Sequence, residues 1–177
     1  MAHTNDKQHL LDQRYLAMAR IWSQNSYCKR RQVGALMVKD QMIISDGYNG
    51  TPSGFENVCE EDDVTKPYVL HAEANAITKV AKSNNSSDGA TMYITASPCI
   101  ECAKLIIQAG IKRVVYSEEY RKDDGIELLK RAGIDVVHTE EEIIIKYRNE
   151  KQIPLASSDL LIQCYTSNAT SSKPDRQ

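Results

Sequence analysis

The chain has 177 residues, enough for one domain with a sizeable core, and 41% of them are hydrophobic against 26% charged. Its net charge is −2 at pH 7, which argues against a surface dominated by contacts to nucleic-acid phosphates. No N-terminal apolar segment is typical of a signal peptide, and no run is long enough to span a membrane. The five cysteines fit a reducing compartment better than a disulfide framework. We therefore expect a cytoplasmic protein without nucleic-acid or membrane partners.

The first part of the chain predicts a helix followed by a hairpin. Apolar residues at helical spacing indicate a helix over residues 7–23, at Leu11, Tyr15, Met18, Ala19 and Trp22. After a polar, basic loop, two apolar runs separated by a tight turn predict strands over residues 33–39 and 42–48. Residues 49–70 then read as a long loop with two glycines, two prolines and an acidic run. Loops of this length in compact domains tend to be functional.

The rest of the chain alternates helices and strands. We expect helices over 71–82, 100–109 and 125–132, and strands over 91–95, 113–116 and 135–137. Such alternation implies parallel neighbouring strands, so with the hairpin it predicts an α/β fold: a three-layer α/β/α sandwich with a five-stranded mixed sheet. Residues 139–147 fit either a helix or an edge strand. We expect one domain over 1–155 and a partly disordered or loosely docked tail over 156–177.

Two short motifs carry the chemistry of the chain. His71-Ala72-Glu73 is followed by Pro98-Cys99-Ile100-Glu101-Cys102, so three side chains that bind zinc are accompanied by one carboxylate. A structural zinc site normally has four protein ligands, whereas a catalytic site has three and leaves the fourth position to water or substrate. His71, Cys99 and Cys102 supply three ligands, and Glu73 is close enough in sequence to move a proton of the water. Each motif opens a predicted helix, whose N-terminal dipole favours ionised thiolates.

Each part of this pattern also has a plainer interpretation. A Cys-x-x-Cys pair alone fits a redox pair or half of a structural zinc site, a lone histidine is most often structural, and Glu73 alone is most often a solvated helix residue. The ordered combination His-x-Glu and then Pro-Cys-x-x-Cys is much more specific, because it is the signature of the zinc nucleobase deaminases. We therefore favour a catalytic zinc site.

Over about residues 7–138 the chain resembles the deoxycytidylate (dCMP) deaminases of the cytidine deaminase superfamily. The stretches that carry the resemblance are residues 28–35, 47–54, 71–77, 97–104 and 109–112. The metal motifs belong to the whole superfamily, whereas the loop Gly-Tyr-Asn-Gly-x-Pro-x-Gly over 47–54 indicates the dCMP branch. The resemblance implies a cytidine-deaminase-like fold and the hydrolysis of dCMP to dUMP and ammonia, which supplies dUMP for thymidylate synthesis.

The resemblance also implies roles for individual residues. One catalytic Zn²⁺ is held by His71, Cys99 and Cys102, and Glu73 passes protons to N3 of the pyrimidine and to the departing amine. The substrate-binding candidates are Asn49 near the deoxyribose, backbone groups near Ala72 and Ser97 at the base, and Arg30, Arg31, Tyr120 and Arg121 at the 5′-phosphate. The alternatives are a turn asparagine at Asn49 and solvated surface charges at the arginines.

Many dCMP deaminases are regulated, and the resemblance extends to this property. It implies dCTP with Mg²⁺ as an activator and dTTP as an inhibitor, bound by a loop with Gly47, Tyr48, Asn49, Gly50 and Gly54. Some relatives hold a second, structural zinc, but residues 49–70 contain no histidine, so we expect one zinc per chain. We also expect a homohexamer.

Other functions remain open at this point. They are a deaminase that also accepts dCTP, a deaminase of tRNA adenosine or a free purine, and a non-catalytic zinc-bound assembly module. A module of this last kind would not need Glu73.

Overall fold

The computed structural model describes residues 2–120, 123–139, 144–146 and 152–154 of the chain. Residues 1–141 and residues 142–177 form two separate compact units. The helices of the first unit are α1 (Ala2–Ser23), α2 (Ala72–Ala81), α3 (Ile100–Gln108) and α4 (Asp124–Arg131). Its main sheet contains β1 (Gly34–Lys39), β2 (Met42–Tyr48), β5 (Thr91–Ala96), β6 (Arg113–Glu118) and β7 (Asp135–His138), in the order β2-β1-β5-β6-β7.

The sheet is mixed, as the sequence predicts. β1 pairs antiparallel with both β2 and β5, whereas β5, β6 and β7 are parallel to one another. The β1–β2 turn contains Asp40 and Gln41 with φ of 50° and 61°, the left-handed conformation that matches the twist of a two-residue hairpin. The predicted hairpin and the five-stranded mixed sheet are thus confirmed.

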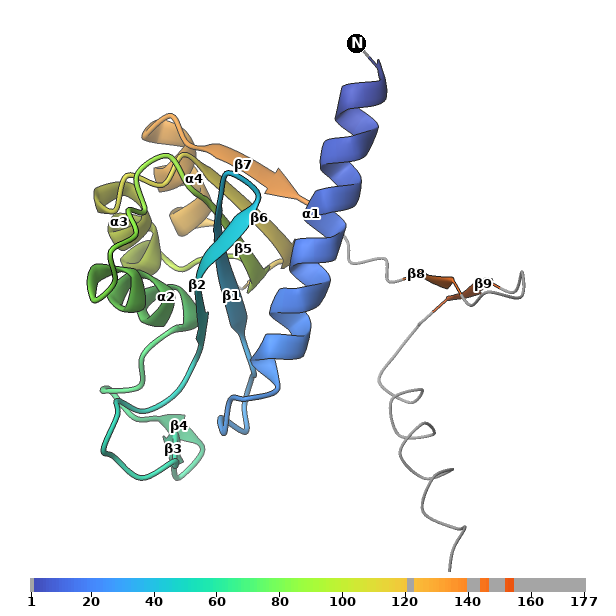
Figure 1. Cartoon of the computed structure of the whole chain (residues 1–177). Coiled ribbons are helices and arrows are strands. Elements are labelled where there is room, and N and C mark those ends of the chain that lie inside the picture. Colours follow the sequence, from blue (N-terminus) through green and yellow to red (C-terminus); the bar gives the residue numbers. More distant parts are fainter. Residues whose placement is uncertain (1, 121–122, 140–143, 147–151, 155–177) are drawn as a thin grey trace, which may run out of the picture. The chain divides into compact units, whose positions relative to one another are not determined.

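The two faces of the sheet are covered by different helices. Successive residues of β1 point to opposite faces, so Ala35 and Met37 join the core beneath α2, α3 and α4, while Leu36 and Val38 pack against α1. Figure 1 shows α1 on one side of the sheet and the other three helices on the opposite side. This arrangement confirms the three-layer α/β/α sandwich.

A buried charged cluster attaches α1 to the sheet. Asp12 of α1 is 2% exposed and accepts hydrogen bonds of 2.8 and 2.7 Å from Arg113 and of 2.9 Å from the Tyr93 hydroxyl. Burial by itself would raise the pKa of Asp12, but the hydrogen bonds from Arg113, Gln8 and Tyr93 outweigh it and lower the pKa below 3.8. The carboxylate is therefore held ionised against the face of the sheet opposite α2 and α3.

The long loop before α2 has a structure that the sequence did not reveal. It contains a small hairpin of β3 (Glu60–Glu61) and β4 (Val64–Thr65), joined by Asp62 and Asp63 with φ of 48° and 60°. The acidic run is thus a tight turn with its flanking strands, and its lack of apolar alternation hides the strands.

A disulfide joins this loop to the segment after α1. Cys59, the residue before β3, is bonded to Cys28, and both residues are buried. The preference for reduced cysteines over a disulfide framework was wrong for this pair. A sequence separation of 31 residues gives no local signal that the two sulfurs meet.

The second unit contains a short antiparallel pair, β8 (Ile144–Lys146) and β9 (Gln152–Pro154). Of the two interpretations of residues 139–147, the strand is correct for 144–146. The tail over 156–177 lies outside the described residues, so the boundary at residue 155 stays a prediction. None of the helices in the described part of the chain is long and apolar enough to cross a bilayer.

Candidate active site

Two helix N-termini converge on the predicted metal ligands. His71 is the N-cap residue of α2 and Cys99 is the N-cap residue of α3; both have extended backbones, and neither side chain caps its helix. The two side chains are therefore free of the usual capping role. Cys102 follows in the first turn of α3, one turn beyond Cys99. The partial positive charge of both helix ends favours a negatively charged ligand set.

The spacing of the ligand atoms suits a tetrahedral zinc ion. The Nδ1 atom of His71 lies 3.5 Å from Sγ of Cys99 and 3.3 Å from Sγ of Cys102, and all three ligand atoms lie within 4.8 Å of one another. With ordinary zinc–sulfur and zinc–nitrogen bonds, the N–S edge of such a tetrahedron measures about 3.5 Å. His71, Cys99 and Cys102 are thus positioned to bind a metal.

The protonation of this cluster is consistent with metal binding. Hydrogen bonds from Cys102 and then His71 lower the pKa of Cys99 to about 3, while the bond to Cys99, together with burial, raises the pKa of Cys102. Cysteine binds zinc as the thiolate, so binding of a zinc ion would release the thiol proton of Cys102.

Glu73 is a buried carboxylic acid beside the ligands. It lies in the first turn of α2, is 4% exposed and lines the same cavity as His71 and Cys99. Burial raises its pKa above the usual 4.5, because desolvation disfavours the charged form. A carboxyl group whose pKa is raised in this way is suited to both accepting and donating a proton during catalysis.

Two glycines permit the close packing that positions the ligand-bearing segments. A Cβ atom on Gly47 of β2 would lie 2.1 Å from the carbonyl oxygen of Ala72, and one on Gly125 of α4 would lie 2.1 Å from that of Pro98. Both distances are far below contact, so any larger residue would push α2 or the Pro98–Cys99 backbone away. Gly47, a predicted effector residue, therefore also has a packing role. The packing role of Gly125 is invisible in the sequence, where this residue reads only as a helix start.

Two members of the metal-binding cluster, His71 and Cys99, line a cavity of about 510 Å³. The cavity brings together six of the predicted substrate residues: Arg30, Arg31, Asn49, Ala72, Ser97 and Tyr120. Arg121 lies outside the described residues. Of the predicted effector residues, Asn49 also lines the cavity. Gly54 is not among the lining residues; it lies in the long loop before α2 and has a φ of 92°.

Asn49 and Ser97 both hold neighbouring backbone in place. The Asn49 amide donates to the carbonyl of Arg31 (2.9 Å) and accepts from the N–H of Val33 (2.8 Å). The Ser97 hydroxyl accepts from the N–H of Tyr120 (2.7 Å). Asn49 thus fixes the segment that carries Arg31, and Ser97 fixes the segment that carries Tyr120.

Arg31 is oriented by two contacts. Its guanidinium donates to Glu118 (2.6 Å) and lies over the ring of Tyr120, 5.2 Å from the ring centroid. Glu118 also binds Arg20 of α1. The Arg31 side chain is about one third exposed and lines the cavity.

The sequence analysis missed one part of the cavity wall. Cys28, Glu60, Thr65, Val69 and Glu119 also line the cavity, and three of these come from the long loop. The sequence gives only weak hints of this part of the wall: the unassigned residues Cys28 and Cys59, and the length of the loop itself.

Comparisons with known proteins agree with this site. Residues 10–118 match the family described as the cytidine and deoxycytidylate deaminase zinc-binding region. ComE operon protein 2 of Bacillus subtilis is 37% identical over 148 residues, which covers 80% of this chain and 78% of that protein. The deoxycytidylate deaminase of Enterobacteria phage T4 is 34% identical over 165 residues, which covers 68% of this chain and 86% of that protein.

A solved structure shows the same fold at higher identity. The crystal structure of dCMP deaminase from the cyanophage S-TIM5, in complex with dCMP and dUMP, has a TM-score of 0.71 and 49% sequence identity. The match covers 73% of this chain and 96% of that chain. The chain therefore belongs to the cytidine and deoxycytidylate deaminase family. As such it is a zinc-dependent hydrolase of the deaminase class.

Proposed function

We propose that this enzyme hydrolyses dCMP to dUMP and ammonia. The observation that carries the proposal is the position of Glu73 and the ligand cluster in one cavity whose wall also presents Arg30 and Arg31. Glu73 and the metal ligands suit the attack of water on a nucleobase, and the two arginines suit the binding of a 5′-phosphate. The named activities of the phage T4 and S-TIM5 relatives support this substrate.

The chain's own residues account for the proton transfers. His71, Cys99 and Cys102 would hold a zinc ion, which would activate a water for attack at C4 near neutral pH. Glu73 accepts one proton from this water and delivers it to N3 of the ring. It then takes the proton of the hydroxyl group now on C4 and delivers it to the amine, so that the C4–N bond breaks, ammonia leaves and a carbonyl forms at C4. Burial keeps Glu73 away from bulk water during these transfers.

The opposite wall of the cavity holds the sugar and the phosphate in this proposal. Arg30 and Arg31 neutralise the phosphate, with Arg31 oriented by Glu118 and Tyr120. Asn49 lies near the deoxyribose and fixes the Arg31 backbone. Backbone groups near Ala72 and Ser97 contact the base, and Arg121 is a further cation for the phosphate.

Regulation belongs to the same proposal. We place dCTP with Mg²⁺, the activator, and dTTP, the inhibitor, at the loop with Gly47, Tyr48, Asn49, Gly50 and Gly54. Asn49 lines the catalytic cavity and directly follows β2, so an effector on this loop has a short path to Arg31. Hyperbolic dCMP saturation that neither nucleotide changes would contradict this regulation.

The wider context follows from the chemistry. We place the enzyme in the cytoplasm, because its charged substrate does not cross membranes, and we assign its dUMP to thymidylate synthesis.

One zinc per chain is supported by the Cys28–Cys59 disulfide, which removes two cysteines as ligands. A homohexamer is supported by exposed apolar side chains of α1 and β2, among them Ile21, Trp22 and Met42.

Turnover of dCMP by the purified zinc protein tests the proposal. We expect release of ammonia and dUMP that rises with dCTP and Mg²⁺ and falls with dTTP. Metal analysis should give one zinc per chain. Absence of dCMP turnover in protein with its zinc bound would contradict the proposed function.

A further inference from the structure

The loop before α2 is a small folded unit of its own. Gly50 and Leu70 close it by exchanging two backbone hydrogen bonds, of 3.0 and 2.9 Å. Within it, Glu56 accepts hydrogen bonds from Lys66 (3.0 Å) and from the hydroxyl of Tyr68 (3.1 Å). Residues 50–70, which we call the clip loop, therefore have internal contacts that hold their shape.

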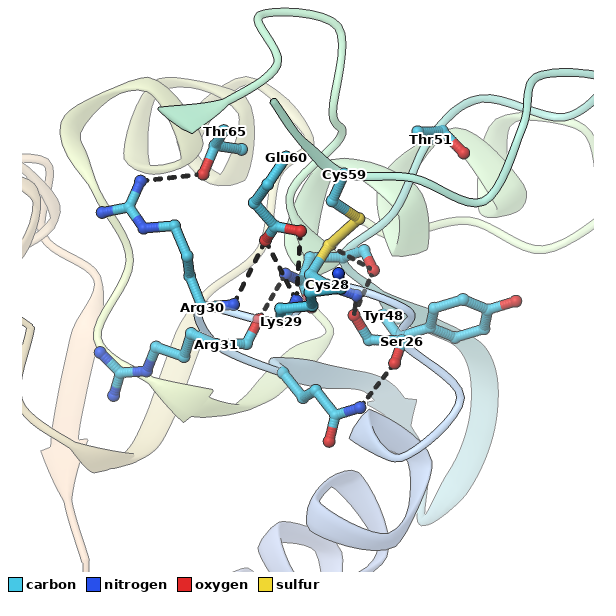
Figure 2. Close-up of a disulfide and its surroundings, with 12 residues drawn as sticks. Ser26, Cys28, Lys29, Arg30, Arg31, Tyr48, Thr51, Cys59, Glu60 and Thr65 are labelled. Carbon is cyan, nitrogen blue, oxygen red and sulfur yellow. Dashed lines mark hydrogen bonds between the residues drawn. A yellow bond between two sulfur atoms is a disulfide. The ribbon is translucent and has the colours of Figure 1, made fainter. Parts of the chain in front are cut away.

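Three contacts join the clip loop to the segment that carries the cavity arginines (Figure 2). Cys59 is bonded to Cys28. The carboxylate of Glu60 accepts hydrogen bonds from the backbone N–H groups of Lys29 (3.1 Å) and Arg30 (3.3 Å). The hydroxyl of Thr65 accepts one from the guanidinium of Arg30 (3.1 Å).

These contacts fix both the backbone and the side chain of Arg30. Without these contacts the backbone and the arginine side chain would sample many conformations. The conformational entropy lost on ordering them would then oppose nucleotide binding. Asn49 fixes the same segment from its other end, through the carbonyl of Arg31. The clip loop thus holds the end of this segment that contains Arg30, and Asn49 holds the end that contains Arg31.

We propose that the clip loop positions Arg30 for the substrate's 5′-phosphate, and that the Cys28–Cys59 disulfide makes this positioning dependent on redox state. The proposal rests on dCMP as the substrate. Glu60, Thr65 and the two cysteines are positioning residues here, since they act through Arg30. Loss of the contacts between the clip loop and residues 28–30 should therefore weaken nucleotide binding and leave the chemical step nearly intact.

The redox step is a two-electron reduction of the disulfide. A phosphine reductant attacks one sulfur, the S–S bond breaks, and water converts the phosphine to its oxide while the two sulfurs leave as thiols. The cysteines are reduced and the phosphorus is oxidised. After reduction, Glu60 and Thr65 alone hold the clip loop against residues 28–31.

Four variants of the zinc-loaded enzyme test the proposal: Cys28→Ser/Cys59→Ser, Thr65→Val, Glu60→Ala and its matched control Glu61→Ala. Glu61 is the exposed neighbour of Glu60 and carries the same charge. The measurements are KM and kcat for dCMP, and the inhibition constants of dUMP and of deoxyuridine, which lacks the phosphate. Zinc content is measured for each sample.

For the first three variants we expect KM for dCMP and the inhibition constant of dUMP to rise about tenfold, with kcat falling less than twofold. The constant for deoxyuridine and the values for Glu61→Ala should stay close to those of the wild type. Reducing the wild type should reproduce the double-cysteine variant, which should itself be insensitive to the reductant.

Unchanged KM and dUMP inhibition in all three variants and in the reduced wild type would overturn the inference, while wild-type turnover of dCMP would leave the proposed function standing. Equal weakening of dUMP and deoxyuridine would also overturn it, because it would indicate general damage to the cavity. If the double-cysteine variant does not fold, Thr65→Val and reduction of the wild type decide the matter. An inert wild type with bound zinc would contradict the proposed function, and the inference with it.

Discussion

The two walls of the cavity are built in different ways. The wall that carries His71, Cys99 and Glu73 consists of two helix N-termini packed on the mixed sheet, and each of its functional residues lies within three positions of a helix start. The wall that carries Arg30 and Arg31 consists of loops held by a disulfide, by Glu60 and by Asn49. Regular secondary structure thus places the reacting groups, and long-range side-chain contacts place the charges that select the substrate.

This difference predicts how the two walls respond to change. A wall of helix ends and sheet moves only if a core contact is disturbed, because the layers on each side are closely packed. A wall of loops depends on a few individual bonds, so it can be loosened one bond at a time without loss of the fold. Chemistry and substrate affinity should therefore be separable by mutation.

The largest expected effect is loss of the buried carboxylate on the helix wall. In Glu73→Gln the side chain keeps its size but can no longer accept and release protons, so kcat for dCMP should fall by about 10²–10⁴-fold. Steady-state kinetics measure this, with zinc content and circular dichroism as checks that metal and fold are retained. Full activity of this variant would point to a zinc-bound module in which Glu73 has no catalytic role.

The opposite face of the sheet provides a contrast to both walls. Asp12→Asn should lower the free energy of unfolding by about 2–3 kcal/mol at pH 7, because Arg113 loses a charged partner in buried surroundings. KM for dCMP at a temperature well below unfolding should not change. Urea titration and steady-state kinetics measure the two quantities, and a large change in KM would show that the site is coupled to this face.

The same residue predicts the pH dependence of stability. The pKa of Asp12 is lower in the folded protein than its usual 3.8, so its contribution is present above about pH 4 and is lost as the pH falls through the folded pKa. The stability difference between wild type and Asp12→Asn should therefore shrink below about pH 4. A difference that stays constant down to pH 2 would contradict the role of this ionised carboxylate.

A smaller effect should come from the packing beneath the helix wall. Gly125→Ala places a methyl group against the carbonyl of Pro98 and shifts the Cys99 backbone, so we expect zinc affinity to fall about tenfold. Competition with a chelator measures it. Lys130→Ala, at an exposed position of the same helix, is the control and should retain the wild-type affinity.

The same contrast explains which features the sequence predicts. The residues His71, Glu73, Cys99 and Cys102 are grouped in two short motifs, and each motif coincides with a helix start that local patterns reveal. The five strands also follow from local patterns. Glu60 and the Cys28–Cys59 bond could not be predicted in the same way, because their partners lie about thirty residues away and no local periodicity connects them.

Arg31 lies between these two cases. Its residue type suggests a phosphate, and the structure places it in the cavity wall. Its orientation comes from Glu118 at the end of β6, from the ring of Tyr120 and from the Asn49 amide. These contacts arise only when the strands assemble, so the sequence indicates the charge but not its direction.

The comparison of kcat/KM for dCMP and for deoxycytidine, measured on the wild-type zinc enzyme, tests the division of the cavity most directly. If the helix wall performs the chemistry and the loop wall holds the phosphate, dCMP should be preferred by about 100-fold or more, since the arginines act only on the phosphorylated substrate. Equal values for the two substrates would show that Arg30 and Arg31 do not select the nucleotide, and would contradict this account of the site.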